Sequence, residues 1–317
     1  MGGGDARGGY RVDPRGGRSD ARGYRDDARA SDEPRGRDEH RGRDEHRGAA
    51  AAPVRGPGER VVYGANPVRE LIDRKPTSVR ALWVDVHRAG RVGSDPVASL
   101  VAAARAVGVK VEERERELLD GAAGEGAVHQ GVVAWLGPFV YAELDDLLQP
   151  AGESSGPPLI VALDGVEDPR NLGAILRSAY LLGARGVIIP EHRAAAVTAV
   201  TAKASAGASE LLPVVQVGNL VRALEDLREH GLWRVAVHAT EGAVPLAEID
   251  ATLPLVLVMG AEGTGVRPLV AKHCDFHAVI PMARSAVGSF NVSVAAAIAL
   301  YEIHRQRTAA QGIPDEA

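Results

Sequence analysis

The chain has 317 residues, of which 45% are hydrophobic, and it contains a single cysteine, Cys274. This length allows more than one core, and a lone cysteine excludes an internal disulfide, which is typical of a reducing, cytoplasmic compartment. The formal net charge of -5 does not indicate nucleic-acid binding by the whole chain, so an RNA contact would need a local basic patch. Apolar runs such as PLVLVMGA are too short to cross a membrane, and the opening MGGGDARGGY is not expected to be a secretory signal.

Residues 1–58 form a first region of low complexity. They hold 13 arginines and 11 acidic residues, and the hexamer RGRDEH occurs twice, at 35–40 and 41–46. Such a segment buries too little apolar area to offset its conformational entropy, so we expect a disordered tail. The RGG-like triplets at Arg7 and Arg15 could bind RNA without sequence preference. Because the acids nearly cancel the arginines, a solubilising tail is the favoured interpretation.

Residues 59–140 predict a small α/β domain that binds the RNA substrate. Asn66 and Asp95 are each followed by proline, which combines a helix cap with the residue preferred at the first helical position. The second of these helices should run to Ala106. Three segments are typical of strands: VRALWVDV, VKVEE and GVVAWLG.

The rest of the chain predicts a linker, a larger domain and a short tail. Proline, glycine and serine in QPAGESSGPP indicate a linker within 141–157. From 158 to 309, helix-like stretches alternate with apolar strands, and 310–317 form a C-terminal tail. The strands are LIVAL, GVIIP, LPVVQV, WRVAVHA, PLVLVMG and FHAVI. Strands that are apolar throughout predict a parallel sheet with helices on both faces, in which ligands bind beyond the carboxyl ends of the strands.

The loop after LIVAL is the first candidate for chemistry. In DGVEDPRNLGAILRSA, we expect Asp168 and the following proline to form a turn, with Asn171 where the helix starts. The spacing predicts that Arg177 shares a helix face with Asn171, and Arg170 stands at the mouth of the loop. A capped helix with solvated arginines is an equally good interpretation of the spacing alone.

The loop after PLVLVMG is the second candidate. MGAEGTGV has three glycines within six residues, which permit positive φ angles and close approach of a ligand. It matches neither the dinucleotide fingerprint nor a Walker loop, since no Lys-Ser/Thr follows the glycines. Glu262 lies inside this loop, where a carboxylate can accept hydrogen bonds from hydroxyls or from an arginine.

The loop after FHAVI is the third candidate. IPMARSAVGSFNVSVA carries Arg284 and opens a long apolar helix, for which Ser289 is a natural N-cap. Helical spacing predicts an inward face from three residues: Val294, Ile298 and Tyr301. Asn291 should then point from the first turn towards the carboxyl edge of the sheet. An alternative is that Asn291 is a second capping residue.

Taken in order, these loops resemble the three motifs of the SpoU/TrmH class of the SPOUT superfamily, which are RNA ribose 2′-O-methyltransferases. The matching segments are N-x-G-A-I-x-R-S-A, G-A-E-G-x-G and S-x-N-V-S-V-A-x-A, within about 158–307. In the small domain, VYGANPVRELI and GAVHQGVVA resemble the N-terminal RNA-binding domain of one branch, the RlmB type, which methylates a guanosine ribose in 23S rRNA. Residues 1–58 have no counterpart in this pattern.

The resemblance implies a knotted α/β catalytic domain that binds S-adenosyl-L-methionine in a bent form. It also implies a homodimer with the active site close to the interface. By motif position, it implies a catalytic polar set: Arg177, Asn171, Glu262, Ser289 and Asn291. It implies a cofactor pocket built largely from backbone groups: Thr240, Met259, Gly260, Gly263, Ile280, Met282, Ser289 and Phe290. RNA contacts are assigned to Arg170, Arg284, His129 and Gln130.

The implied reaction moves a methyl group to a ribose 2′-oxygen, which must lose its proton. A guanidinium stays protonated, with a pKa above about 12, so we expect Arg177 to bind the adjacent phosphate and stabilise the developing alkoxide. The proton could leave through that phosphate, through water or through Glu262. No metal is expected, because the histidines show no ligand spacing, and Cys274 is expected to be a small buried residue.

The leading function is therefore 2′-O-methylation of a guanosine ribose in 23S rRNA. A tRNA ribose 2′-O-methyltransferase is the nearest alternative, and the His-Gln-Gly segment of the small domain argues for rRNA. A catalytically idle RNA-binding assembly protein is the third possibility. The intact polar residues of the three motifs argue against it.

Overall fold

The computed structural model describes these residues: 56, 58–89, 95–124, 126–149, 156–284 and 288–312. Nearly all of the predicted N-terminal tail, with both RGG-like triplets, lies outside them, as do 150–155 of the predicted linker and 313–317 of the predicted C-terminal tail. Within the described parts, no helix is long and apolar enough to cross a membrane.

The first sheet has four strands in the order β1-β4-β2-β3. Their bounds are β1 (Arg60–Tyr63), β2 (Val79–Asp85), β3 (Val111–Arg114) and β4 (Val132–Leu136). The β1–β4 and β2–β4 pairs are antiparallel, and the β2–β3 pair is parallel. The three predicted strands are confirmed. The strand β1 was not predicted, because its four residues RVVY are too few to show a periodic pattern.

The helices around this sheet are α1 (Ala65–Arg74), η1 (Pro76–Ser78), α2 (Val86–Ala89), α3 (Pro96–Ala106) and α4 (Arg116–Ala123). The Asp95 cap is confirmed, since its side chain accepts a hydrogen bond from Val97 N at 2.9 Å. The prediction for Asn66 is wrong, because α1 starts two residues earlier than expected, at Ala65, and its N-cap is Gly64. The exposed N–H of Ala65 is instead satisfied by Gln130 Oε1 at 2.8 Å.

The second sheet has seven strands in the order β7-β6-β5-β10-β8-β11-β9, and every neighbouring pair is parallel. Their bounds are β5 (Leu159–Asp164), β6 (Gly186–Pro190), β7 (Val214–Val217), β8 (Trp233–Val237), β9 (Val244–Pro245), β10 (Leu255–Gly260) and β11 (Phe276–Val279). The six predicted strands are confirmed. The two-residue strand β9 was not predicted, since it is too short to carry a pattern.

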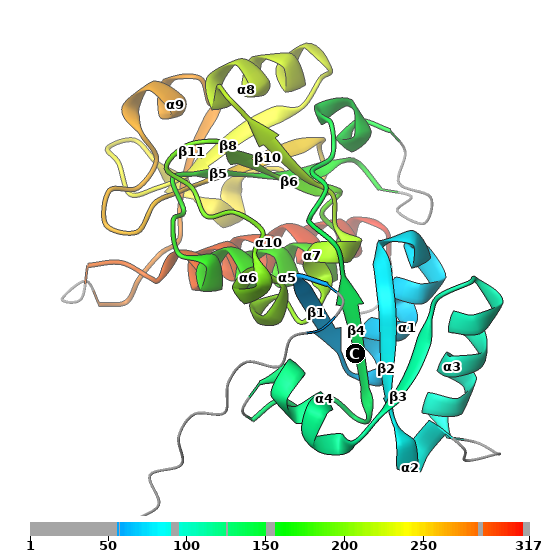
Figure 1. Ribbon diagram of the computed structural model, residues 1–317. Helices are drawn as coiled ribbons and strands as arrows, with labels where there is room; N and C mark the ends of the chain where they lie inside the picture. The colour runs from blue at the N-terminus through cyan, green and yellow to red at the C-terminus, as the bar shows by residue number, and fades with distance from the viewer. Residues whose placement is uncertain are drawn as a thin grey trace, which may run out of the picture. The chain divides into compact units, whose positions relative to one another are not determined.

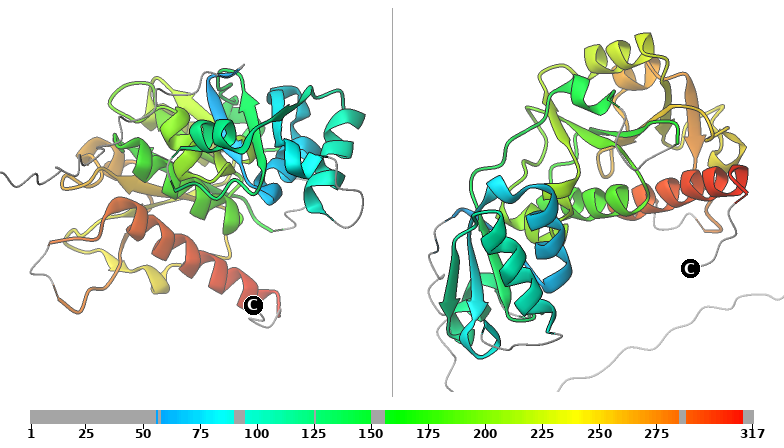
Figure 2. Two further views of the ribbon diagram at one scale, coloured as in Figure 1. Left: turned by 60° about the horizontal axis from the view of Figure 1, so that its bottom comes forward. Right: turned by 90° about the vertical axis from the view of Figure 1, so that its right-hand side faces the viewer.

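Helices cover both faces of the second sheet, as Figures 1 and 2 show. On one face, α5 (Pro169–Leu181) and α10 (Val292–Ala310) pack against each other and share a core with β5 and β10. On the other face, α8 (Leu220–Glu229) and α9 (Pro268–Lys272) form a second core with the same strands. The short helices α6 (Ala199–Ala204) and α7 (Ala208–Leu211) lie beside α5. This confirms the predicted parallel sheet that is buried on both faces.

Part of the predicted linker is structured. Residues 141–149 contain the 3₁₀ helix η2 (Leu144–Leu147), and Leu147 is fully buried in the core on the α8 side of the sheet. A second 3₁₀ helix, η3 (Leu246–Glu248), follows β9. The predicted linker included η2 because it was extended from the Pro/Gly/Ser-rich segment QPAGESSGPP back to residue 141, and four residues are too few to show a helical pattern.

Two helices start at residues other than those predicted. The helix α5 begins at Pro169, and Asp168 is its N-cap through a hydrogen bond from Arg170 N to Asp168 Oδ1 at 2.7 Å. The expected turn at Asp168 is therefore the helix start, and Asn171 lies in the first turn. The helix α10 is capped by Asn291, whose Oδ1 accepts from Ser293 N at 2.9 Å. The prediction of a Ser289 cap is wrong.

The apolar face of α10 that was predicted to pack inward is exposed. Val294 is 46% exposed, Ile298 36% and Tyr301 55%. The buried residues are on the opposite side of the helix: Val292, Ala296, Ala299, Leu300 and Ile303. Both faces of α10 are apolar. The helical spacing therefore shows which residues share a face, but it does not show which face packs against the sheet.

Candidate active site

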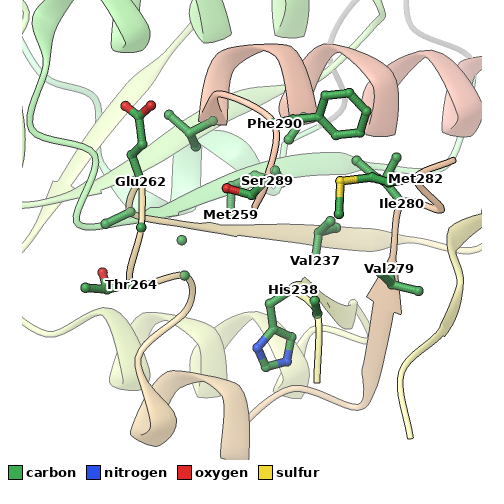
Figure 3. Close-up of a pocket in the computed structure, with 17 residues that line it drawn as sticks. Val237, His238, Met259, Glu262, Thr264, Val279, Ile280, Met282, Ser289 and Phe290 are labelled. Atoms are coloured by element: carbon green, nitrogen blue, oxygen red, sulfur yellow. The ribbon is translucent and has the colours of Figure 1, made fainter. Parts of the chain in front are cut away.

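A cavity of about 280 Å³ lies beyond the carboxyl ends of three neighbouring strands, β8, β10 and β11. We call it the first cavity. Its lining includes the strand-end residues Val237, Gly260 and Val279, as Figure 3 shows in part. The position agrees with the rule that parallel sheets bind ligands beyond these ends, and with the loops singled out in the sequence.

The glycine loop that follows β10 forms one wall of the first cavity. It closes on itself through two hydrogen bonds, Ala261 N to Gly265 O at 3.1 Å and Gly265 N to Ala261 O at 2.9 Å. A Cβ on Gly260 would lie 1.9 Å from the backbone carbon of Gly265, so only glycine fits there. Gly263 and Gly265 have φ angles of 82° and 67°. The three glycines are therefore required by the loop itself, because a side chain would clash or strain the backbone at each of them.

The structure brings together most of the residues that were expected at the cofactor. The first cavity is lined by Met259, Gly260, Gly263, Ile280, Met282, Ser289 and Phe290. In Figure 3, Glu262 and Thr264 of the glycine loop lie across the cavity from Ile280 and Met282. Thr240 is exposed and is not among the described residues that line the cavity. Its carbonyl accepts from Ala243 N at 3.2 Å, in the turn after β8.

A second cavity, of about 360 Å³, adjoins the first. It lies between the loop after β5 and the glycine loop, and Asn171 forms part of its wall. Four residues line both cavities: Ala261, Glu262, Thr264 and Val292. Glu262 is therefore the only acidic residue, among the described residues, that lines both cavities.

Two asparagines from different motifs meet at the edge of the second cavity. Asn291 Nδ2 donates a hydrogen bond to Asn171 Oδ1 at 3.2 Å. At the same time, Asn291 Oδ1 accepts from Ser293 N at 2.9 Å and from Ser293 Oγ at 2.6 Å. Both interpretations of Asn291 therefore hold, since it caps α10 and also projects its amide towards the first motif.

The predicted position of Arg177 is wrong. Arg177 is exposed, and it is not among the described residues that line either cavity. Six residues of an α-helix turn through about 600°, which leaves Arg177 about 120° away from Asn171. Leu181, one turn further along α5, is 67% exposed on the same side. Arg170 and Arg284 are also exposed, as expected for residues that could contact RNA.

His129 cannot contact RNA as predicted, because its ring is buried with 3% exposure. Its Nδ1 accepts from Gly131 N at 3.1 Å, so the proton is on Nε2, which donates to Asp120 Oδ1 at 2.9 Å. The ring is a structural residue of the small domain. Gln130 is exposed at φ 54°, and its Oε1 is engaged by Ala65 N.

His238 is a cavity residue that sequence reasoning missed. It lines the first cavity directly after β8, and its Nε2 lies 2.9 Å from His277 Nδ1. Burial, and then the neighbouring His277, lower the pKa of His238, so its ring is neutral at neutral pH. Its place at the carboxyl end of the predicted strand WRVAVHA was the available signal, because ligands bind at that edge of a parallel sheet.

Cys274, which was expected to be buried, is partly buried against the core on the α9 side of the sheet. Burial raises the pKa of the Cys274 thiol to about 12, so it stays protonated, and it contacts Val270 O at 3.4 Å. Among the described residues, no group of three or more His, Cys, Asp or Glu side chains could hold a metal ion.

Comparison with known proteins defines the class. A family model described as "SpoU rRNA Methylase family" matches residues 158–301, and one described as "RNA 2'-O ribose methyltransferase substrate binding" matches 61–142. The chain belongs to the SpoU rRNA methylase family, which confirms the resemblance expected from the three motifs.

Individual relatives make the comparison more specific. The chain is 46% identical over 251 residues to the 23S rRNA (guanosine-2'-O-)-methyltransferase RlmB of Pseudomonas aeruginosa, which covers 78% of this chain and 96% of that protein. It is 42% identical over 263 residues to an uncharacterized tRNA/rRNA methyltransferase of Mycobacterium avium, covering 81% and 82%. A solved structure of the SpoU methyltransferase AviRb from Streptomyces viridochromogenes, in complex with the cofactor AdoMet, has a TM-score of 0.62 and 30% identity, covering 80% and 92%.

Proposed function

We propose that this chain transfers a methyl group from S-adenosyl-L-methionine to the ribose 2′-oxygen of a guanosine in 23S rRNA. The observation that carries the proposal is the pair of adjoining cavities with Glu262 in their common wall. A group transfer requires the donor and the acceptor to be held side by side. The relatives named as 23S rRNA (guanosine-2'-O-)-methyltransferases support the choice of acceptor.

The first cavity suits the methyl donor. Its glycine loop leaves backbone groups open to close approach, and a Cβ at Gly260 would remove that space. Apolar side chains of Ile280, Met282 and Phe290 offer surface for an adenosine moiety. When bound, S-adenosyl-L-methionine supplies a methyl group on a positively charged sulfur. The neutral ring of His238 adds no like charge to the cavity.

The second cavity suits the acceptor nucleotide. We assign Glu262 to accept the proton of the 2′-hydroxyl, because it is the acidic residue that lines both cavities. The amides of Asn171 and Asn291 would orient the ribose through the hydrogen-bonded pair that they form. Ser289 lines the donor side. Arg177, which lies outside both cavities, would bind an RNA phosphate, since its guanidinium is exposed and stays charged.

We propose a homodimer formed through the exposed face of α10. Three apolar residues of this helix are 36–55% exposed: Val294, Ile298 and Tyr301. Leu181 on the adjacent helix α5 is 67% exposed and extends the apolar surface. An isologous contact between two copies would cover this surface. Arg177 lies on the same exposed side of α5 as Leu181, so this dimer would bring it to the interface.

We propose the domain organisation and the knot on separate grounds. Two sheets with separate cores support a small RNA-binding domain at 59–140 and a methyltransferase domain at 158–309. The two family models fall within these ranges or close to them. The knot is implied by the family resemblance, and the return of the chain after β11 to pack α10 against α5 is compatible with it. A cytoplasmic location follows from the rRNA substrate.

The alternatives keep the RNA partner and change the target or the activity. A relative in Bacillus subtilis is named a putative tRNA/rRNA methyltransferase, so a tRNA target is the second candidate. The relatives named as 23S rRNA (guanosine-2'-O-)-methyltransferases, which match this chain over most of its length, favour rRNA. An idle assembly protein would not need the two adjoining cavities or the carboxylate between them.

Mapping ribose methylation across all rRNA and tRNA in a deletion strain tests the proposal. We expect one guanosine of 23S rRNA to lose its 2′-O-methyl group. The wild-type gene should restore that methyl group, and a Glu262→Gln variant should restore little of it. A loss in tRNA would favour the second candidate, and unchanged methylation in every RNA would favour the idle assembly protein.

A further inference from the structure

Asp164, the last residue of β5, is a buried carboxylate beneath the glycine loop. It is 1% exposed. Its Oδ2 accepts from Arg267 N at 2.7 Å, and its Oδ1 accepts from Arg267 Nε at 2.6 Å and contacts Arg267 Nη2 at 2.5 Å. A buried carboxylate is tolerated only when such charge-assisted hydrogen bonds replace its lost hydration.

This pair connects the two ends of the glycine loop. Asp164 lies beside Gly260 in the register of β5 and β10, at the point where the loop begins. Arg267 is the N-cap of α9, at the point where the loop ends. The Asp164 carboxylate therefore holds the end of the loop against the strand that borders its start. The loop in between carries Glu262, which lines both cavities.

Neither Asp164 nor Arg267 is among the described residues that line either cavity. Any effect of this pair on the reaction must therefore pass through the shape of the loop. The loop has only two internal hydrogen bonds, between Ala261 and Gly265, and its glycines allow many other conformations. An external restraint is needed to keep one of them.

We infer that Asp164 is a positioning residue, which fixes the glycine loop through Arg267 and thereby sets the places of Glu262 and of the methyl donor. This inference rests on the proposed function. A group that orients a site residue through a second residue contributes by preorganisation rather than by contact with the substrate.

A second pair in the same sheet offers a matched control. Asp275 Oδ2 accepts from Arg234 N and Arg234 Nε, both at 2.9 Å, and Asp275 Oδ1 accepts from Arg234 Nη2 at 2.7 Å. The three arginine donors are the same as in the first pair. Arg234 is in the first half of β8 and Asp275 directly precedes β11, so this pair lies at the amino ends of the strands, opposite both cavities. A purely structural role predicts the same behaviour for both pairs.

The test compares Asp164→Asn with Asp275→Asn in the full chain. S-adenosyl-L-methionine affinity is measured by calorimetry well below the melting temperature of each variant, and kcat and both KM values are measured on 23S rRNA. We expect both variants to melt at a lower temperature than the wild type. Asp164→Asn should weaken the binding of S-adenosyl-L-methionine by about tenfold or more, and Asp275→Asn by less than about twofold.

A further variant covers the case in which Asp164→Asn does not fold. Arg267→Lys keeps the backbone hydrogen bond and the charge but loses the planar fork, so it should give a smaller loss in the same direction. Wild-type binding and turnover in the folded Asp164 variant, or in Arg267→Lys if that is the one that folds, would overturn the inference. Equal losses of affinity in Asp164→Asn and Asp275→Asn would also overturn it. A wild-type chain that neither binds S-adenosyl-L-methionine nor methylates RNA would instead contradict the proposed function.

Discussion

The two faces of α10 have the same apolar character and opposite surroundings. Ala299 and Leu300 are fully buried against the sheet, whereas Ile298 is 36% and Tyr301 is 55% exposed. Helical spacing places each set on one side, and either set could have met the core. The comparison shows that an apolar face on a helix predicts its burial. It does not show whether that face is buried by the same chain or by a second copy.

The arginines on the two faces of α10 also have different partners. On the buried side, Arg307 donates to backbone carbonyls of Ala251, Pro157 and Leu253 and so attaches the end of α10 to the loops before β5 and β10. On the exposed side, Arg305 pairs with Glu302 on the same helix. The hydrogen bonds of Arg307 help to stabilise the fold. The Arg305–Glu302 pair is a surface ion pair, which is expected to contribute little to the free energy of unfolding.

The largest effect is expected from the buried face. Leu300→Ala removes a side chain with 0% exposure from the core between α10 and the sheet. We expect the free energy of unfolding to fall by about 2–5 kcal/mol, because a cavity remains where the side chain was. Denaturant unfolding measures it. Ile298→Ala, two residues earlier on the exposed face, is the control, and an equal loss in both would mean that the two faces are not distinct.

Arg307→Met should give the next largest effect. The substitution keeps most of the aliphatic stem and leaves several buried carbonyls without their donor, which should cost about 1–3 kcal/mol. Arg305→Met removes the exposed pair with Glu302 and should change stability by less than about 1 kcal/mol. Thermal melting of the two variants side by side checks the difference. A larger loss for Arg305→Met would contradict the assignment of the buried side.

The first turn of α10 allows capping to be separated from chemistry. Asn291→Ala removes the cap and should cost about 1 kcal/mol of stability. Asn291→Asp keeps an oxygen for Ser293 N and loses the amide that donates to Asn171. Its stability should therefore stay near that of the wild type while its single-turnover methylation rate falls to the level of the alanine variant. Full activity in Asn291→Asp would leave Asn291 with the capping role alone.

The smallest change in monomer stability is expected on the exposed face. Combined replacement of Ile298 and Tyr301 by serine should alter it by about 0.5 kcal/mol or less at each site, as for other surface positions. The same change should convert a dimer into monomers, because it removes the apolar surface that the second copy would cover. Sedimentation equilibrium measures the mass. A dimer that survives the replacement would locate the interface elsewhere on the molecule.

The sequence predicted much of the larger sheet because each of its long strands is apolar throughout. The strands β1 and β9 could not be predicted, since segments of four and two residues show no periodicity. The helix η2 was also missed, because it has only four residues and lies just before the segment whose composition indicates a linker. In the site, the glycine loop was found from its spacing, while His238 and Asp164 were missed because single polar residues at strand ends carry no motif of their own.

The sequence by itself determined the local requirements of this protein. The glycines of the second motif are needed because a Cβ at Gly260 would meet the backbone of Gly265. The order of apolar strands and polar loops likewise predicted that the loops gather at one edge of a parallel sheet. These features depend on neighbours in the chain or on a rule that holds for every sheet of this kind.

Only the tertiary structure decided which distant residues meet. The amide of Asn291 reaches Asn171 across 120 residues of chain, Arg267 reaches Asp164 across 103, and Arg177 turns away from both cavities. Which apolar face of α10 is buried was also decided there. The physical reason is that parallel pairing of β5 with β10 fixes where their loops meet, and the side from which α10 returns to the sheet selects the face that loses contact with water.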